Sequence, residues 1–137
     1  MASGGKKVLI VGCGRLGAMV TKALLDRGDE VVILDLDAEN FRRLTEQPGL
    51  TMVLGDGTSH DELRRDGIES VDSFAALTGQ DTTNALAAQT AQVTFKVPHV
   101  VCRVNDPIRQ KMYEELGLRT VSPSKIMTDL VTQALDA

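Results

Sequence analysis

Short apolar runs alternate with stretches of helical periodicity, and this alternation leaves few folds open to the chain. The apolar runs are residues 8–11, 31–34, 50–54, 74–77, 100–104 and 120–121. Continuous apolar runs are typical of strands that are buried on both faces of a sheet. Strands that alternate with helices form parallel sheets through right-handed crossovers. We therefore predict an α/β fold with a doubly wound, six-stranded parallel sheet of order 3-2-1-4-5-6, as in Rossmann-like proteins.

Capping residues mark the ends of the intervening helices. Glycines that can cap a helix C-terminus stand at positions 28, 67 and 117. Candidate N-caps are Asp37, Ser59, Asp81, Asp106 and Ser122, the last two followed by proline at the first helical position. Ser59 and Glu62 also have the spacing of a capping box. In this motif the serine side chain accepts from the glutamate N–H, and the glutamate side chain accepts from the serine N–H.

Length and charge exclude several classes of protein. The 137 residues suit one domain, which we place at residues 7–137 after a flexible tail at residues 1–6. Lys and Arg number 15 against 19 Asp and Glu, so the net charge of −4 argues against nucleic-acid binding. No apolar stretch approaches the ~18 residues of a membrane helix, so we expect no direct membrane insertion. Cys13 and Cys102 form no C-x-x-C pair, which favours a reducing cytoplasm and predicts no metal site.

The first apolar run is followed by the motif Gly-Cys-Gly-Arg-Leu-Gly at residues 12–17, at the start of a helix. In this motif the first glycine permits a tight turn and the second lets phosphates approach the backbone. The third glycine lets the helix pack closely on the strand. Free N–H groups at the helix N-terminus then bind the phosphates. The strand before and the helix after make this a strong signal for a nucleotide.

An acidic residue, Asp35, ends the second apolar run 18 residues beyond Gly17. A carboxylate at this place can accept both ribose hydroxyls of an adenosine. It would repel a 2′-phosphate, and the following Leu36 provides no positive charge to bind one. NAD(H) is therefore the expected cofactor and is preferred to NADP(H), while ATP or ADP would satisfy the same half-site.

The residues needed for catalysis are missing from the motifs. Gly17 is followed by Ala18-Met19, so the Lys-Ser/Thr pair of a Walker A loop is absent. Tyr113 has Gly117 four residues later, so the Tyr-x-x-x-Lys pair of short-chain dehydrogenases is absent as well. We therefore predict no catalytic residue and no enzyme. The alternative is a small NAD-dependent oxidoreductase, or the isolated cofactor domain of a dehydrogenase.

Several longer segments carry a family resemblance that covers the chain from about Val8 to its end. They are Val-Gly-Cys-Gly-Arg-Leu-Gly at 11–17, Ile-Leu-Asp-Leu-Asp at 33–37, Gly-Asp-Gly-Thr at 55–58, Ala-Leu-Thr-Gly-Gln-Asp-Thr-Thr-Asn at 76–84, Cys-Arg-Val-Asn-Asp-Pro at 102–107 and Leu-Gly-Leu-Arg-Thr-Val-Ser-Pro at 116–123. With these segments the chain resembles the RCK, or KTN, family. Its members are the N-terminal nucleotide-binding domains of regulators of Trk- and Ktr-type potassium uptake systems.

The resemblance implies a regulatory subunit that senses NAD(H), ATP or ADP and gates a membrane-embedded potassium transporter or channel. Such a subunit is cytoplasmic and peripheral to the inner face of the membrane. By position, Arg15 would face the phosphates, Asp56 would lie near the adenine and Arg103 would contact a phosphate or a subunit. The full expected cofactor-binding set is Gly12, Cys13, Gly14, Arg15, Leu16, Gly17, Asp35, Leu36, Asp56, Gly57, Thr78, Gly79 and Arg103.

Two segments are expected to make subunit contacts. Residues 82–95 contain no charge, so this helix is either deeply buried or part of an interface. The last helix carries an apolar stripe formed by Ile126, Met127, Leu130, Val131, Ala134 and Leu135. In the family the corresponding helix crosses to a neighbouring subunit, which implies a homodimer or a higher ring. Family members usually continue into a second small ligand-binding domain beyond the position of Ala137.

Overall fold

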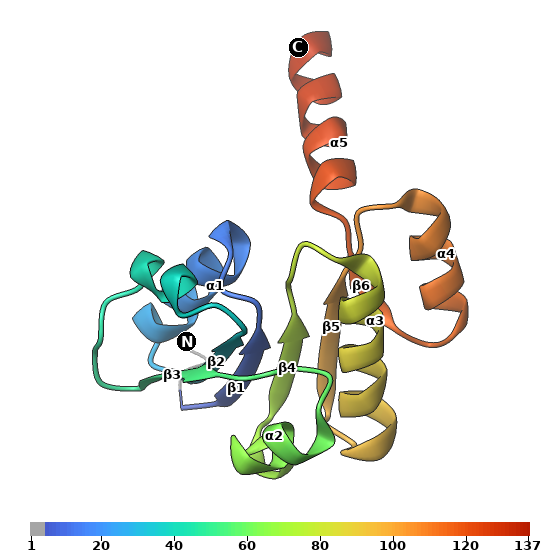
Figure 1. Cartoon of the computed structure of the whole chain (residues 1–137). Coiled ribbons are helices and arrows are strands. Elements are labelled where there is room, and N and C mark those ends of the chain that lie inside the picture. The colour runs from blue at the N-terminus through green and yellow to red at the C-terminus, as the bar shows by residue number, and fades with distance from the viewer. Residues whose placement is uncertain (1–4) are drawn as a thin grey trace.

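The computed structural model describes residues 5–137 of the chain, and these residues form one parallel sheet with helices on both faces (Figure 1). The strand order in the sheet is β3-β2-β1-β4-β5-β6, as the sequence predicts. The strands are β1 (Lys7–Val11), β2 (Glu30–Asp35), β3 (Leu50–Leu54), β4 (Ser73–Ala76), β5 (His99–Arg103) and β6 (Arg119–Val121). Strand β1 pairs with β2 on one side and with β4 on the other, so the chain reverses its direction of winding between β1 and β4.

Helical segments connect every pair of successive strands. The α-helices are α1 (Arg15–Asp26), α2 (His60–Arg65), α3 (Asp81–Gln89), α4 (Pro107–Glu115) and α5 (Pro123–Asp136). Two 3-10 helices, η1 (Ala38–Arg43) and η2 (Ile68–Ser70), and a π-helical turn, η3 (Thr90–Thr94), complete the list. The helix expected after Asp37 is thus a short 3-10 helix, and Asp37 caps it by accepting from the Glu39 N–H at 3.0 Å.

Each face of the sheet has its own hydrophobic core, which explains why the strands are apolar without alternation. Along β1, Leu9 and Val11 belong to the core under α2 and α3, whereas Val8 and Ile10 belong to the core under α1 and η1. All four of these side chains are buried. Successive strand residues point to opposite faces, so a sheet covered on both faces needs apolar residues at every position.

Two capping predictions are corrected by side-chain geometry. Ser59 does cap α2 by accepting from the Glu62 N–H at 3.2 Å, but the Glu62 carboxylate accepts from the Asp56 N–H at 3.3 Å rather than from Ser59. The capping box is therefore half formed. Asp81 is not an N-cap: Gln80 occupies that position, and Asp81 accepts from backbone N–H groups of the loop before α4.

The uncharged stretch of residues 82–95 buries one face and exposes the other. Helix α3 and the following π-turn η3 bury a row of small residues against the sheet: Asn84, Ala85, Ala87, Ala88, Thr90 and Ala91. Two larger side chains, Leu86 and Val93, face outward with exposed fractions of 53% and 66%. Six of the fourteen residues in the stretch are thus buried, and a narrow apolar strip is left at the surface.

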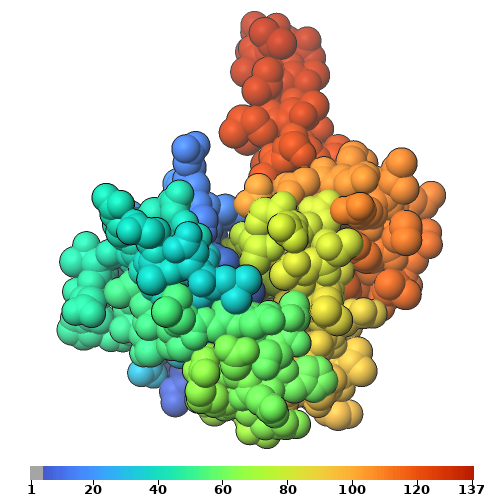
Figure 2. Space-filling model, viewed as in Figure 1, coloured from blue at the N-terminus to red at the C-terminus, as the bar shows by residue number. Residues whose placement is uncertain are grey.

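Helix α5 extends away from the rest of the molecule (Figure 1, Figure 2). No described residue of this helix is buried, and Leu135 is 80% exposed. The sequence-predicted apolar stripe is therefore in solvent in the single chain. Among the described helices, none has the length and apolar character needed to cross a membrane.

The start of the described chain lies at the amino ends of the central strands β1 and β2. Residues 1–4 of the expected N-terminal tail lie outside the described residues. Gly5 and Lys6 donate their backbone N–H groups to the Gly28 carbonyl at 2.9 Å and to Asp29 Oδ1 at 3.1 Å.

Candidate functional site

A cavity of about 520 Å³ opens at the carboxyl ends of β1, β2 and β4. This is the point where the winding of the sheet reverses, the usual ligand site of an open α/β sheet. Nine of the sequence-predicted residues line it: Gly12, Gly14, Asp35, Leu36, Asp56, Gly57, Thr78, Gly79 and Arg103. Four others, Cys13, Arg15, Leu16 and Gly17, lie beside the cavity rather than in its wall. Sequence reasoning missed Asn40, Gly55, Gln80 and Thr83, which also line it.

The three motif glycines are needed for different reasons. Gly12 has a φ of +105°, and a Cβ there would lie 2.8 Å from the backbone nitrogen of Thr78. A Cβ on Gly17 would overlap the carbonyl oxygen of Gly12. By contrast, a Cβ on Gly14 would meet no described heavy atom within 4 Å. The packing of the chain therefore explains Gly12 and Gly17, whereas Gly14 leaves room at the cavity wall for a ligand.

Helix α1 presents an uncapped N-terminus to the cavity. Side chains cap η1, α2, α4 and α5, whereas among the described α-helices α1 at Gly14 and α3 at Gln80 have no side-chain cap. The first N–H groups of a helix have no partner within the helix and carry a partial positive charge. The arrangement therefore suits an anion such as a phosphate.

Asp35 is fixed at the end of β2 by three N–H donors. Its Oδ2 accepts from the Cys13 N–H at 2.7 Å, which ties the carboxylate to the glycine loop. Its Oδ1 accepts from the Asp37 N–H and from Asn40 Nδ2, each at 2.9 Å. The glycine loop, the end of β2 and η1 thus form one hydrogen-bonded unit around the carboxylate.

The opposite wall of the cavity is braced by the side chain of Asn84, which is completely buried. Its Oδ1 accepts from the backbone N–H and the hydroxyl of Thr78, at 2.9 and 2.6 Å. Its Nδ2 donates to the carbonyls of Thr78 and Arg103, at 2.9 and 3.0 Å. One side chain therefore joins the carboxyl ends of β4 and β5.

Asp56 lies at the end of the cavity that follows β3. Its Oδ1 accepts from the hydroxyl and the N–H of Thr58, at 2.7 and 2.9 Å. These two hydrogen bonds hold the pKa of the Asp56 carboxyl below its ordinary value, against a smaller opposing effect of burial. A charged acceptor is thus kept at this end of the cavity at neutral pH.

We expect Thr58→Val to raise the pKa of Asp56, because the variant removes the stronger of the two hydrogen bonds. Thr58→Ser keeps the hydroxyl and is the matched control. A lowered carboxyl pKa stabilises the native state above the ordinary pKa, and this stabilisation is lost as the pH falls through the folded value. Carboxyl-carbon NMR titration of both variants measures the shift, and an unchanged pKa in Thr58→Val would contradict the assignment.

A second hollow, of about 440 Å³, lies behind the glycine loop. Arg15, Arg43 and Arg103 line it together with Leu16, Met19 and Pro123. Within residues 5–137, none of these three arginines pairs with a carboxylate. Arg103 lines both hollows, and its Nε donates to Asn105 Oδ1 at 3.2 Å.

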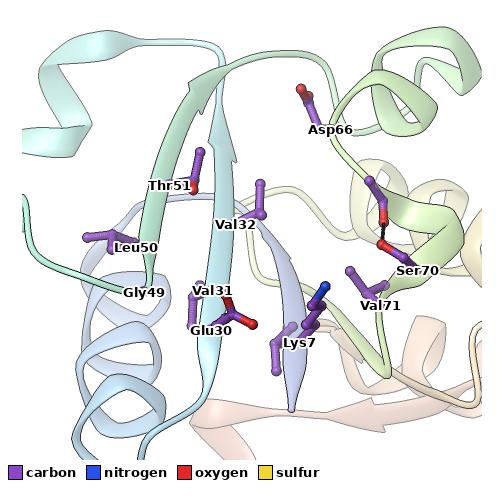
Figure 3. Close-up of a pocket in the computed structure, with 12 residues that line it drawn as sticks. Lys7, Glu30, Val31, Val32, Gly49, Leu50, Thr51, Asp66, Ser70 and Val71 are labelled. Carbon is purple, nitrogen blue, oxygen red and sulfur yellow. Dashed lines mark hydrogen bonds between the residues drawn. The ribbon is translucent and has the colours of Figure 1, made fainter. Parts of the chain in front are cut away.

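A third hollow, of about 290 Å³, lies at the opposite end of the strands from the glycine loop, near the amino ends of β1 and β2 (Figure 3). Its wall contains Val8, Val31, Val32 and Val71, with charged side chains at the rim. The Ser70 hydroxyl is already satisfied by donating to the Gly67 carbonyl at 3.1 Å. This hollow brings together neither a free helix N-terminus nor a glycine loop, so it is the weaker candidate for a nucleotide.

Both thiols are completely buried. Burial, with the nearby charge of Asp35, raises the pKa of Cys13. Burial and the charge of Asp81 raise the pKa of Cys102 to about 11. The thiols are therefore protonated at neutral pH, and within the described part of the chain no group of His, Cys, Asp and Glu side chains could hold a metal ion.

Comparison with known sequences matches the chain to one domain family and to a relative with a known name. The sequence model of the TrkA-N domain matches residues 8–123. A Trk system potassium uptake protein TrkA of Streptomyces coelicolor is 38% identical over 128 residues, which are 93% of this chain and 57% of that protein. The chain thus spans little more than half the length of this relative.

The fold is shared with many solved structures. The TrkA-N domain of the inner membrane protein YbaL from Escherichia coli matches with a TM-score of 0.84 at 17% identity, over 95% of this chain and 96% of that chain. The Kef CTD of Shewanella denitrificans, in an AMP-bound form, matches with a TM-score of 0.78 at 20% identity, over 95% of this chain and 80% of that chain.

Proposed function

The chain belongs to the TrkA-N domain family, and from this premise we propose that it is a nucleotide-binding regulatory domain of a potassium uptake system. The observation that carries the proposal is the cavity in which Gly14, the uncapped N-terminus of α1 and Asp35 meet. The TrkA name of the Streptomyces coelicolor relative supports the link to potassium transport. The ligand would bias the assembly through its different affinity for two conformational states.

We assign the ligand to NAD(H), with ATP or ADP as alternatives for the same half-site. The N–H groups of α1 would bind the phosphates next to Gly14, and Asp35 would accept from the ribose. Asp56 would accept from the exocyclic amine of the adenine, and Arg103 would contact the outer phosphate. The AMP-bound form of the Kef neighbour supports an adenine nucleotide for this fold.

A regulatory role agrees with the chemistry of the cavity wall. Within the described chain, its lining contains no histidine, lysine, tyrosine or cysteine side chain. These groups often transfer protons or act as nucleophiles in enzymes, and the two carboxylates of the lining, Asp35 and Asp56, already accept hydrogen bonds from the protein. The lining therefore suits binding better than hydride transfer to a substrate.

Calorimetric titration with NAD⁺, NADH, NADPH, ATP and ADP tests the nucleotide assignment. We expect NADPH to bind more weakly than NADH, because Asp35 repels a 2′-phosphate. Asp35→Asn keeps the size of the side chain but removes its charge. It should weaken binding of the preferred nucleotide by about tenfold or more, as hydrogen bonds to a charged group are worth ~1.5–3 kcal/mol. Asp61→Asn, at an exposed residue of α2, is the control.

The proposal would be overturned if the chain bound none of the five nucleotides. Equal affinities of the wild type and Asp35→Asn would leave nucleotide binding standing but would remove Asp35 from the ribose site. If no nucleotide binds, the chain is better described as an assembly scaffold.

We further propose that the domain is cytoplasmic, acts at the inner face of the membrane through a potassium transporter or channel subunit, and self-associates through α5. This helix exposes Leu130, Val131 and Leu135 on one apolar face. An apolar helix face of this kind usually packs against another helix. Leu86 and Val93 on α3 and η3 provide a smaller apolar contact surface.

We expect Val131→Glu to shift the chain towards the monomer, because a charge buried between two helices without a partner is costly. Thr132→Glu adds the same charge on the polar face, next to the ion pair of Lys125 and Asp129, and is the control. Sedimentation velocity at tens of micromolar protein measures the difference. A wild-type chain that is monomeric under these conditions would contradict self-association through α5.

A further inference from the structure

The Asp35 carboxylate has little hydrogen-bonding capacity left for a ligand. Its two oxygens offer about four lone-pair sites in total. Oδ1 accepts two hydrogen bonds, from the Asp37 N–H and from Asn40 Nδ2, so both of its sites are used. Oδ2 accepts one, from the Cys13 N–H. One site, on Oδ2, therefore remains for a ribose hydroxyl.

Asn40 is the one donor of the three that belongs to a side chain. The N–H groups of Cys13 and Asp37 are part of the backbone that forms the glycine loop and the cap of η1. The Asn40 side chain also lines the cavity, directly beside the carboxylate. A substitution at position 40 is therefore the way to release a site on Oδ1 without altering the backbone.

The Asn40 side chain is held in place from its other end. Arg43 donates from Nη1 to the amide oxygen, Asn40 Oδ1, at 3.1 Å, while the Cys13 thiol holds the backbone of the same residue by donating to its main-chain carbonyl at 3.3 Å. A flipped amide would set donor against donor at Arg43 and acceptor against acceptor at Asp35. Arg43 and Asp35 therefore fix both the position and the orientation of the Asn40 amide.

We propose that Asn40 is a specificity-determining residue that limits Asp35 to a single ribose hydroxyl of the bound nucleotide. The inference rests on the proposed nucleotide-binding function. Without Asn40, Asp35 can accept from both hydroxyls, one on each oxygen. With Asn40 in place, the second hydroxyl makes no hydrogen bond to the carboxylate, and its loss costs little affinity.

The wild-type chain tests this directly, without any variant. Calorimetric titration compares ADP with 2′-deoxy-ADP and 3′-deoxy-ADP. We expect one of the deoxy nucleotides to bind about tenfold or more weakly than ADP, the range of a hydrogen bond to a charged group. The other should bind within about threefold of ADP, because its missing hydroxyl has no site on Asp35.

Two variants then test the part played by Asn40. Asn40→Ala and Asn40→Leu both remove the amide, one by truncation and the other at similar size. In either variant the second deoxy nucleotide should also lose about tenfold in affinity relative to ADP, since Oδ1 is now open to the second hydroxyl. Glu39→Ala is the control: it alters an exposed residue of the same 3-10 helix, whose carboxylate pairs with Arg42. Thermal unfolding of each variant establishes that it is folded.

The outcomes separate this inference from the function on which it rests. Equal and large losses for both deoxy nucleotides in the wild type would overturn the inference while leaving nucleotide binding intact. An asymmetry that persists unchanged in the Asn40 variants would also overturn it, because another residue would then set the preference. No binding of ADP or NAD(H) at all would overturn the proposed function and this inference together.

Discussion

Replacing Gly17 with alanine is expected to lower the free energy of unfolding by about 3 kcal/mol, because the added methyl overlaps the carbonyl oxygen of Gly12. That oxygen cannot easily move, since Gly12 stands in a tight turn at a φ of +105° and donates its N–H to the Leu34 carbonyl at 2.8 Å. Helix α1 must therefore shift away from β1. Urea denaturation measures the loss, and we expect the midpoint of thermal unfolding to fall by roughly 10 °C.

Gly14→Ala is the matched control, with the same chemical change three residues earlier. Its Cβ meets no described heavy atom within 4 Å, and its φ of −80° is one that alanine adopts without strain. The stability of this variant should stay within about 1 kcal/mol of the wild type. The methyl enters the wall of the cavity, however, so nucleotide affinity should fall by about tenfold or more, as a loss of ~1.4 kcal/mol or more implies.

The two variants together separate the structural glycine from the ligand-facing one. A large loss of stability in Gly14→Ala, or a small one in Gly17→Ala, would contradict this division of roles. Nucleotide affinity that is unchanged in Gly14→Ala would place the phosphates elsewhere than at the start of α1.

Features encoded by neighbouring residues could be predicted from the sequence. The parallel sheet follows from the alternation of apolar runs and helices, because parallel strands need crossover connections, and the order 3-2-1-4-5-6 is a common one for doubly wound sheets. The N-caps at Asp37, Ser59, Asp106 and Ser122 follow from residue type and spacing. Most of the cavity wall follows from the rule that ligands bind where strands end at the switch point.

What could not be predicted depends on how the fold places separate strands, turns and short helices against one another. Asp81 has the residue type of an N-cap, but it bonds to the N–H groups of Asn105 and Asp106, which the sheet brings to it. Asn40 looks like an ordinary residue of a polar helix until η1 is placed against the glycine loop. The Glu62 carboxylate likewise accepts from the Asp56 N–H and not from the Ser59 N–H, because the turn after β3 places the Asp56 N–H beside it. No local pattern records these partners.

Asn84 gives the second large expected effect, because its amide makes all four of its hydrogen bonds in a completely buried position. Asn84→Leu is close to it in size but removes the partner of the Thr78 N–H and of the Thr78 carbonyl, and leaves the Arg103 carbonyl with only the long contact from the Cys102 thiol at 3.8 Å. Each buried group left unsatisfied costs ~1–3 kcal/mol, so we expect a loss of about 3 kcal/mol or more. Thr82→Val, at an exposed residue of the same helical turn, should change stability by less than about 0.5 kcal/mol.

Asn84→Asp separates the two halves of this network. A carboxylate can still accept from the Thr78 N–H and hydroxyl, but it faces the carbonyl oxygens of Thr78 and Arg103 where the amide donated to them. Burial and these carbonyls raise the pKa of the introduced carboxyl above its unfolded value. The native state then binds the proton more tightly, so the deficit relative to the wild type should shrink as the pH falls from 7 to about 5. Urea denaturation at both pH values measures this, and a pH-independent deficit would mean that the donated bonds to β4 and β5 contribute little.

Because Thr78 and Arg103 both line the cavity, the same variant should also weaken nucleotide binding at neutral pH while leaving α1 and Asp35 in place.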